Sequence, residues 1–307
     1  MNKKHINSQL CRVFNDFVNT IDNENVKTLV NEGTIITGGA LVSLLQGEVP
    51  HDYDMYFKDF KTCYEVAKYF VDKFNDSKKS KKAEIKIKIG NEWTSFEIAL
   101  QNLDKEPRIK IFISSVGIAG EYEDDESTDD MQTNIELDTD IEKELKEEPK
   151  YQPKFLTSNA ISLSGKIQLV IRFYGEADKL HENYDFVHCT NYWTSWNRKV
   201  TLKQDALEST INKELLYVGS KYPLCSIIRT RKFINRGWTI NAGQYLKMCM
   251  QLNELNLKDI SVLEDQLVGV DSTFFAMLID ALQKKKEDDP NFEVNNSYVA
   301  TIIDKIF

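Results

Sequence analysis

Residues 36–57 read ITGGALVSLLQGEVPHDYDMYF, and this stretch decides the fold that the sequence predicts. A β-branched run, TIIT, ends in Gly38 and Gly39, and a compact helical pattern, ALVSLLQGE, follows at once. The next segment, DYDMYF, alternates polar and apolar side chains as a strand does. Asp52 and Asp54 are two positions apart, so this strand would place both carboxylates on one face.

This arrangement of glycines and carboxylates favours a site for a nucleoside triphosphate and Mg²⁺. Two carboxylates held close together repel each other, and a hard divalent cation relieves that repulsion. Glycines let the backbone approach a ligand closely, and the free N–H groups at the start of a helix bind phosphate. Taken separately, an Asp-x-Asp pair is also typical of a polar turn, and a glycine pair of a plain bend.

The same stretch, residues 36–57, resembles the head motif of the DNA polymerase β-like nucleotidyltransferase superfamily. In that superfamily a Gly-Gly or Gly-Ser turn precedes Asp-x-Asp on the next strand. The spacing is similar to that of CCA-adding and bacterial poly(A) polymerases, which carry Arg-Asp where this chain has Val42-Ser43. Later stretches, IQLVIRFYG, YDFVHCTNYW and YPLCSIIRTRKFINRGW, look similar to nucleotidyltransferase-like proteins of large DNA phages.

The resemblance implies an enzyme that moves a nucleoside monophosphate from an NTP such as ATP to an acceptor hydroxyl, first of all an RNA (tRNA) 3′ end. It implies two Mg²⁺ or Mn²⁺ ions, held by Asp52, Asp54 and a third carboxylate on a later strand. Asp185, in ENYDFVHCTNYW, is the preferred third acid because it opens a β-like run, and Glu97, in TSFEIALQ, is its rival. The residues expected at the nucleotide are Gly38, Gly39, Ser43 and Arg172.

Two alternatives stay open beside this interpretation. One is a protein-nucleotidylating enzyme of the toxin type. The other is a catalytically inactive binding module that keeps the fold and uses a helical tail to hold nucleic acid or a protein.

The net charge of −9 is unevenly distributed. Residues 121–148 hold 14 Asp and Glu against two Lys, which predicts a mobile acidic loop inserted at about 121–150. Residues 221–247 hold six Lys and Arg, four large aromatics and no acid. That composition suits RNA or another phosphate-bearing ligand, although a helix with a solvated basic face is the plainer interpretation. The residues expected to contact the acceptor are Arg229, Arg231, Lys232 and Arg236.

A second cluster of lysines runs from a turn into an alternating segment at residues 78–88. Here the favoured interpretation is a hydrophilic loop followed by the wet face of a strand.

Composition places the chain among globular proteins of the cytoplasm. It is 41% hydrophobic, it has five scattered cysteines without a CxxC pair, and no apolar run reaches the length of about 18 residues that a membrane helix needs. We expect an α+β fold in which residues 1–202 form a mixed sheet flanked by helices, as in nucleotidyltransferases. Residues 203–307 are expected to form a helical domain.

Overall fold

The computed structural model describes residues 2–77, 81–115, 150–156, 159–259, 262–263, 266, 281–289 and 292–306. The chain forms two compact units, with the boundary between Asn212 and Lys213. The acidic insertion predicted at about 121–150 lies outside the described residues, Lys150 excepted.

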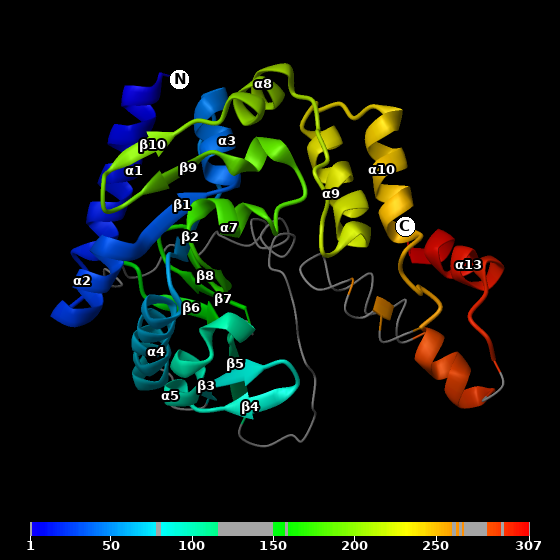
Figure 1. Ribbon diagram of the computed structural model, residues 1–307, viewed down its shortest axis with the longest axis horizontal. Coiled ribbons are helices and arrows are strands. Elements are labelled where there is room, and N and C mark those ends of the chain that lie inside the picture. Colours follow the sequence, from blue (N-terminus) through cyan, green and yellow to red (C-terminus); the bar gives the residue numbers. More distant parts are fainter. Residues whose placement is uncertain are drawn as a thin grey trace, which may run out of the picture. The chain divides into compact units, whose positions relative to one another are not determined.

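The first unit contains two sheets and most of the helices (Figure 1). Its helices are α1 (Lys3–Val18), α2 (Glu24–Gly33), α3 (Gly39–Gln46), α4 (Phe60–Ser77), α5 (Phe96–Gln101), α7 (Ala177–His181) and α8 (Gln204–Asn212), with two 3₁₀ turns, η1 (Leu103–Lys105) and η2 (Val187–Thr190). Its strands are β1 (Thr34–Thr37), β2 (Tyr53–Phe57), β3 (Lys81–Ile89), β4 (Glu92–Thr94), β5 (Arg108–Ser115), β6 (Pro153–Leu156), β7 (Ala160–Leu163), β8 (Ile167–Tyr174), β9 (Tyr192–Thr194) and β10 (Lys199–Thr201).

Seven of these strands form the large sheet, in the order β10-β9-β1-β2-β8-β7-β6. Its neighbours pair antiparallel except β2 and β8, which are parallel, with Asp54 opposite Gln168. The remaining three strands form the small sheet, in the order β4-β3-β5.

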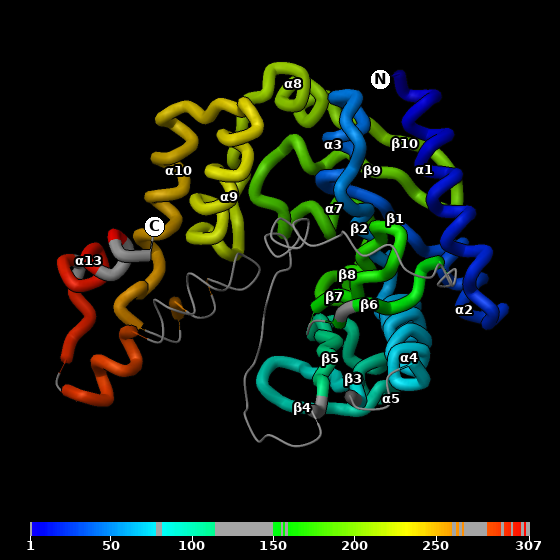
Figure 2. The backbone as a smooth tube through the Cα atoms, turned by 180° about the vertical axis from the view of Figure 1, so that it is seen from behind, coloured from blue at the N-terminus to red at the C-terminus, as the bar shows by residue number. Residues whose placement is uncertain are grey.

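One face of the large sheet carries the main hydrophobic core. Alternate residues of β2, including Met55 and Phe57, join this core because the side-chain period of a strand is two. Helix α1 reaches it with Ile6, Leu10 and Phe14 at helical spacing. The side chain of Asn7 on α1 accepts a hydrogen bond from the backbone of β10, and α1 runs beside that strand in both views (Figures 1 and 2).

The opposite face of the large sheet has a smaller apolar cluster and a set of polar side chains. Ile35 and Tyr56 pack there against Ala177 and Leu180 of α7. Because Asp54 alternates with Met55, it lies on this second face with Tyr56.

The described part of the second unit consists mainly of helices, with one isolated β-bridge between Glu214 and Thr239. Helix α9 (Pro223–Asn235) starts with a proline in its first turn, which fits the fixed backbone angle of that residue. Helix α10 (Ala242–Leu252) is capped by the side chain of Asn241, and residues 281–288 and α13 (Asn296–Ile306) are also helical. Among the described helices, none combines the length and the apolar composition needed to cross a bilayer.

The coarse prediction is confirmed, since the chain is α+β with a large mixed sheet flanked by helices. TSFEIALQ is not a strand, because Ser95 caps a helix there by accepting the backbone N–H of Ile98. YDFVHCTNYW is also not a continuous strand, because it forms η2 before β9 begins at Tyr192. Helix α8 belongs to the first unit, so that unit extends beyond the predicted limit at residue 202.

Candidate functional site

The turn between β1 and α3 has the geometry that its glycines predict. Gly38 has φ +82°, a left-handed conformation that side-chain-bearing residues adopt only with strain, and it is the N-cap of α3. Its backbone N–H donates to the carbonyl oxygen of Cys189, which ties the turn to the η2 segment. Gly39 follows as the first residue of the helix, and the space that a Cβ would take there is open.

The structure brings Asp54 to this turn. A Cβ built on Gly38 would lie 3.5 Å from Oδ2 of Asp54 and 3.6 Å from the hydroxyl oxygen of Tyr184. A carboxylate and a phenol thus lie within ordinary contact distance of Gly38 at the start of α3, where the helix dipole favours negative charge.

Tyr184 stays protonated at neutral pH. Burial raises its pKa well above the ordinary value, and the neighbouring Tyr56 and the charge of Asp54 raise it further. The rings of Tyr56 and Tyr184 lie 6.3 Å apart. The site thus pairs an acid on β2 with a neutral phenol that comes from the segment after α7.

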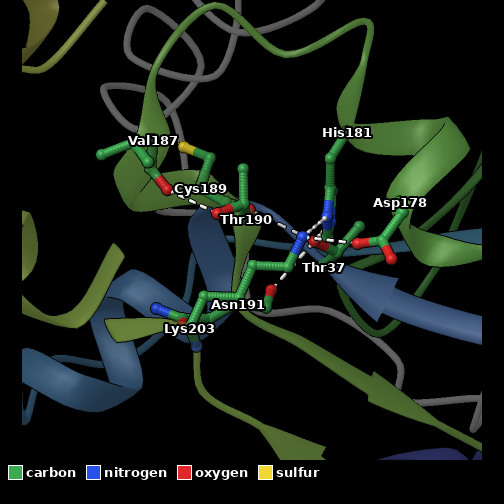
Figure 3. A network of polar contacts seen from close by, with 8 residues as sticks. All are labelled: Thr37, Asp178, His181, Val187, Cys189, Thr190, Asn191 and Lys203. Atoms are coloured by element: carbon green, nitrogen blue, oxygen red, sulfur yellow. Dashed lines mark hydrogen bonds and ion pairs between the residues drawn. The ribbon is translucent and has the colours of Figure 1, made fainter. Parts of the chain in front are cut away.

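Next to this turn lies a network of polar side chains that runs from the buried Thr37 and His181 to the exposed Asp178 (Figure 3). Thr37, the last residue of β1, is fully buried, and its hydroxyl lies 2.9 Å from Nε2 of His181 and 2.9 Å from the carbonyl oxygen of Asn191. On the other side of the imidazole, Nζ of Lys203 lies 3.2 Å from Nδ1 and donates to Asp178 at 2.7 Å. The network therefore joins β1, α7, β9 and the start of α8.

The chemistry of these groups fixes the direction of the hydrogen bonds. An ammonium group only donates, so Nδ1 of His181 must accept from Lys203 and the ring proton must sit on Nε2. Nε2 then donates to the hydroxyl of Thr37, which in turn donates to the carbonyl of Asn191. Burial and the charge of Lys203 lower the pKa of His181 to about 4, against a smaller opposing effect of Asp178. His181 is therefore neutral at physiological pH.

The other residues that the sequence predicted for the site lie in several different structural settings. Asp52 is half-buried just before β2, and Asp185 is buried in the bend that precedes η2 rather than at the start of a strand. Ser43 is 4% exposed in the middle of α3, away from the free N–H groups of its first turn. Arg172 lies on β8 with its guanidinium over the ring of Phe173.

The predicted ion ligands do not form a chelating cluster. Among the described residues, which include Asp52, Asp54 and Asp185, no group of three His, Cys, Asp or Glu side chains is arranged to hold a metal. Glu97, the rival third acid, is exposed on α5 beside the small sheet. We derive no metal-dependent step from these residues, and the two Mg²⁺ or Mn²⁺ ions stay a prediction.

The basic residues predicted to contact the acceptor lie on and just after α9, in the second unit. Arg231 and Lys232 are exposed, whereas Arg229 and Arg236 are half-buried. NTP and RNA as their ligands stay predictions.

Sequence reasoning missed the most organised part of the site. His181, Thr37 and Lys203 come from distant parts of the chain and match no spacing rule. The one available signal was Thr37, one of the two threonines of the TIIT strand, directly before the glycines.

Comparison with known proteins gives the site its context. Residues 9–213 match the model of the Gabija anti-defense 2 family, which is two thirds of the chain and nearly all of the first unit. A protein of Bacillus phage SPbetaL7 named "Gabija anti-defense 2" is 20% identical over 140 residues. The alignment covers 45% of this chain and 34% of the phage protein, so the chain spans about a third of the length of that relative.

These findings correct the functional interpretation of the sequence. The nucleotidyltransferase resemblance rested mainly on the short motif at residues 36–57, whereas the anti-defense family accounts for residues 9–213. The assignment to the polymerase β-like superfamily and the transfer of a nucleotide to a tRNA 3′ end are therefore wrong. A structural role explains the same motif, since Gly38 is needed for its left-handed backbone angle in the turn before α3. The likeness to phage proteins agrees with the source of the relative. On the extent of the family match, this chain belongs to the Gabija anti-defense 2 family.

Proposed function

We propose that this chain counteracts the Gabija defence of a bacterial host, in the host cytoplasm, by binding a protein component of that defence. The observation that carries the proposal is the family match over residues 9–213. The phage relative bears the name of the same activity, and the shared region falls within less than half of either protein. Binding without catalysis is the alternative that the sequence had left open.

The hydrogen bonds around Thr37 and His181 support a structural role for these two side chains. Thr37 is 0% exposed and His181 is 6% exposed, so neither faces a ligand in solution. The hydroxyl and both ring nitrogens have their hydrogen-bond partners inside the chain. A relay satisfied in this way stabilises the turn before α3, and the prediction that the chain is an enzyme stays a prediction.

Exposed apolar side chains support a protein partner. Leu246 and Met250 are one turn apart on α10 and are 63% and 64% exposed. Large apolar groups that share one exposed helix face mark interaction surfaces, and the flexible side chain of methionine adapts to a partner. This face belongs to the described helical unit that follows the family-matched region.

The decisive experiment is a plaque assay in two otherwise identical bacterial strains, one with and one without the Gabija system. Expression of this chain is expected to restore plaques of a Gabija-sensitive phage on the defended strain and to change nothing on the other. The chain is then captured from the defended cells, and a Gabija protein is expected to co-purify in a fixed ratio. Plaques that stay absent while the chain is expressed and folded contradict the proposal as a whole.

Paired variants test the surface on α10. Leu246→Ser with Met250→Ser is expected to weaken binding to the captured component about tenfold or more, as loss of interface anchors does. The matched control, Val49→Ser with Ile211→Ser, removes two apolar side chains that are somewhat more exposed, 79% and 70%, from the first unit. If plaques are restored but no Gabija protein co-purifies, the anti-defense role is supported and the binding mechanism is wrong.

A further inference from the structure

The small sheet has one apolar and one charged face. Ala83 and Ile87 of β3 turn into the main core, and Ile109 and Ile111 of β5 do the same. The alternate residues of these strands therefore lie on the other face, away from that core. On β3 they are Lys82, Glu84, Lys86 and Lys88, and on β5 they include Arg108, Lys110 and Phe112.

Like charges face each other across this sheet. The register places Lys86 directly opposite Lys110 and Lys88 opposite Arg108. Like charges at directly facing positions destabilise a sheet. Glu84 is the one acid among these facing positions of β3 and β5, and its carboxylate lies 3.5 Å from Nζ of Lys86. An anionic ligand is attracted to such a face.

Two aromatic rings lie among these cations. Trp93 of β4 is opposite Lys88, is 51% exposed, and meets the ring of Phe112 edge to face at 5.4 Å. Nζ of Lys88 lies 5.6 Å from the centre of the Trp93 ring, and Nζ of Lys86 lies 5.1 Å from that of Phe112. Aromatic planes held between lysines on an open sheet offer stacking surfaces for bases beside contacts for phosphates.

We propose that this face of the β4-β3-β5 sheet binds single-stranded nucleic acid (cyan strands in Figure 1). Bases stack on Trp93 while phosphates contact the lysines, in a site formed by Lys82, Lys86, Lys88, Trp93, Lys110 and Phe112. The inference goes beyond the proposed function and does not rest on it. A duplex satisfies the charge of this face but keeps its bases stacked inside, so the exposed tryptophan favours a single strand.

The test is fluorescence anisotropy of a labelled oligothymidylate and a matched oligouridylate, each about 12 nucleotides long, with the full chain at about 50 mM salt. We expect binding to both, and a steep loss of affinity when salt is raised to about 200 mM. Lys86→Glu with Lys110→Glu is expected to weaken binding about tenfold or more and to flatten the salt dependence. Trp93→Leu is expected to weaken binding about fivefold or more with the salt dependence unchanged.

The matched control is Arg231→Glu with Lys232→Glu on α9, which makes the same change of charge on the other basic surface. It is expected to leave binding within about twofold of the unaltered chain. The proposal is overturned if the control variant loses binding while the β-face variant keeps it, or if a duplex of equal length binds as tightly as the single strand. Binding that is absent from the unaltered chain, or that Trp93→Leu leaves intact, also overturns it.

A second readout does not depend on a folded variant. Ultraviolet crosslinking of a bromodeoxyuridine-containing strand to the unaltered chain is expected to label peptides from residues 81–94 and 108–115. Labelling confined to residues 223–252 would assign the nucleic acid to the helical unit and contradict the proposed site.

Discussion

The two sheets of the first unit differ in what their polar faces do. On the large sheet, Thr37 lies on a polar face that is buried, and its partners, His181 and Asn191, come from the same chain. On the small sheet, Lys86 lies on a polar face that is exposed and is opposed across the strands by Lys110, a like charge. The two strands also differ in sequence, since β1 reads TIIT and only β3, KKAEIKIKI, alternates charged with apolar residues.

The difference shows that a polar side chain on a strand has a different effect when it is buried than when it is exposed. A buried polar group must be paired inside the protein, because leaving it unpaired costs about 1–3 kcal/mol, so a paired network specifies the fold. An exposed face on which cations lie opposite one another costs stability across the strands, and it favours an external ligand of opposite charge.

The largest expected effect is on the free energy of unfolding, when a tryptophan of each sheet is replaced by alanine. Trp193 of β9 is 0% exposed and packs against Phe14, with ring centres 5.0 Å apart, whereas Trp93 of β4 is 51% exposed. Trp193→Ala is expected to lower the free energy of unfolding by about 3–5 kcal/mol, because it leaves a cavity in the main core. Trp93→Ala is expected to change it by less than about 0.5 kcal/mol.

Urea unfolding of both variants, followed by circular dichroism, measures this comparison. Equal losses of stability would mean that the small sheet is as integral to the fold as the large one, and would remove the distinction drawn between them. The milder Trp193→Phe keeps an aromatic ring in the core and serves as the control for gross misfolding.

A second expected effect concerns pH and belongs to the large sheet alone. His181 has its pKa lowered to about 4 in the folded chain, while an unfolded histidine titrates near 6.5. Above pH 6.5 both states hold the neutral ring and the stability of the network is fully present. As the pH falls from 6.5 toward 4, the unfolded chain binds a proton at this histidine while the folded chain does not. Stability therefore falls, by about 2.5 kcal/mol at pH 4.5.

His181→Gln isolates this effect, because the carboxylates titrate equally in both proteins. The difference in unfolding free energy between the unaltered chain and the variant is expected to shrink as the pH falls through this window. A difference that stays constant from pH 7 to pH 4.5 would show that His181 is not held neutral by its surroundings. Lys203 would then not be the donor to its Nδ1.

How far the sequence predicted the fold follows from the range of the interactions. The turn at Gly38, α3 and β2 were predicted because each depends on neighbours along the chain, through glycine, helical period and strand alternation. TSFEIALQ was mistaken for a strand because its β-branched and aromatic residues outweighed a single capping serine, Ser95. Asp185 was misplaced for a similar reason, since the alternation after it belongs to a 3₁₀ turn.

The site was predicted only where it is local. Gly38 and Asp54 belong to one short motif, and the structure does bring them together. Thr37 and His181 are 144 positions apart, and nothing in the sequence near either one indicates the other. The function was misjudged because the motif at residues 36–57 describes a backbone turn that more than one kind of protein needs, whereas family membership depends on the whole of residues 9–213.

The smallest expected effect sharpens the account of the small sheet, because it separates stability from binding. Lys110→Glu replaces one cation of the opposed pair and places a carboxylate across from Lys86. An opposite-charge pair at directly facing positions stabilises a sheet, so the free energy of unfolding is expected to rise by about 0.2–1 kcal/mol at low salt and to lose this gain as salt is added. Affinity for a single-stranded oligonucleotide is expected to fall in the same variant. If the face were selected for stability, removing Lys110 would lower both the free energy of unfolding and the affinity for the oligonucleotide. A ligand-binding face predicts instead that stability rises while affinity falls, which urea unfolding and anisotropy measure on the same preparation. A variant that is less stable than the unaltered chain would mean that Lys110 supports the fold, and the repulsion across β3 and β5 could then no longer argue for an anionic ligand.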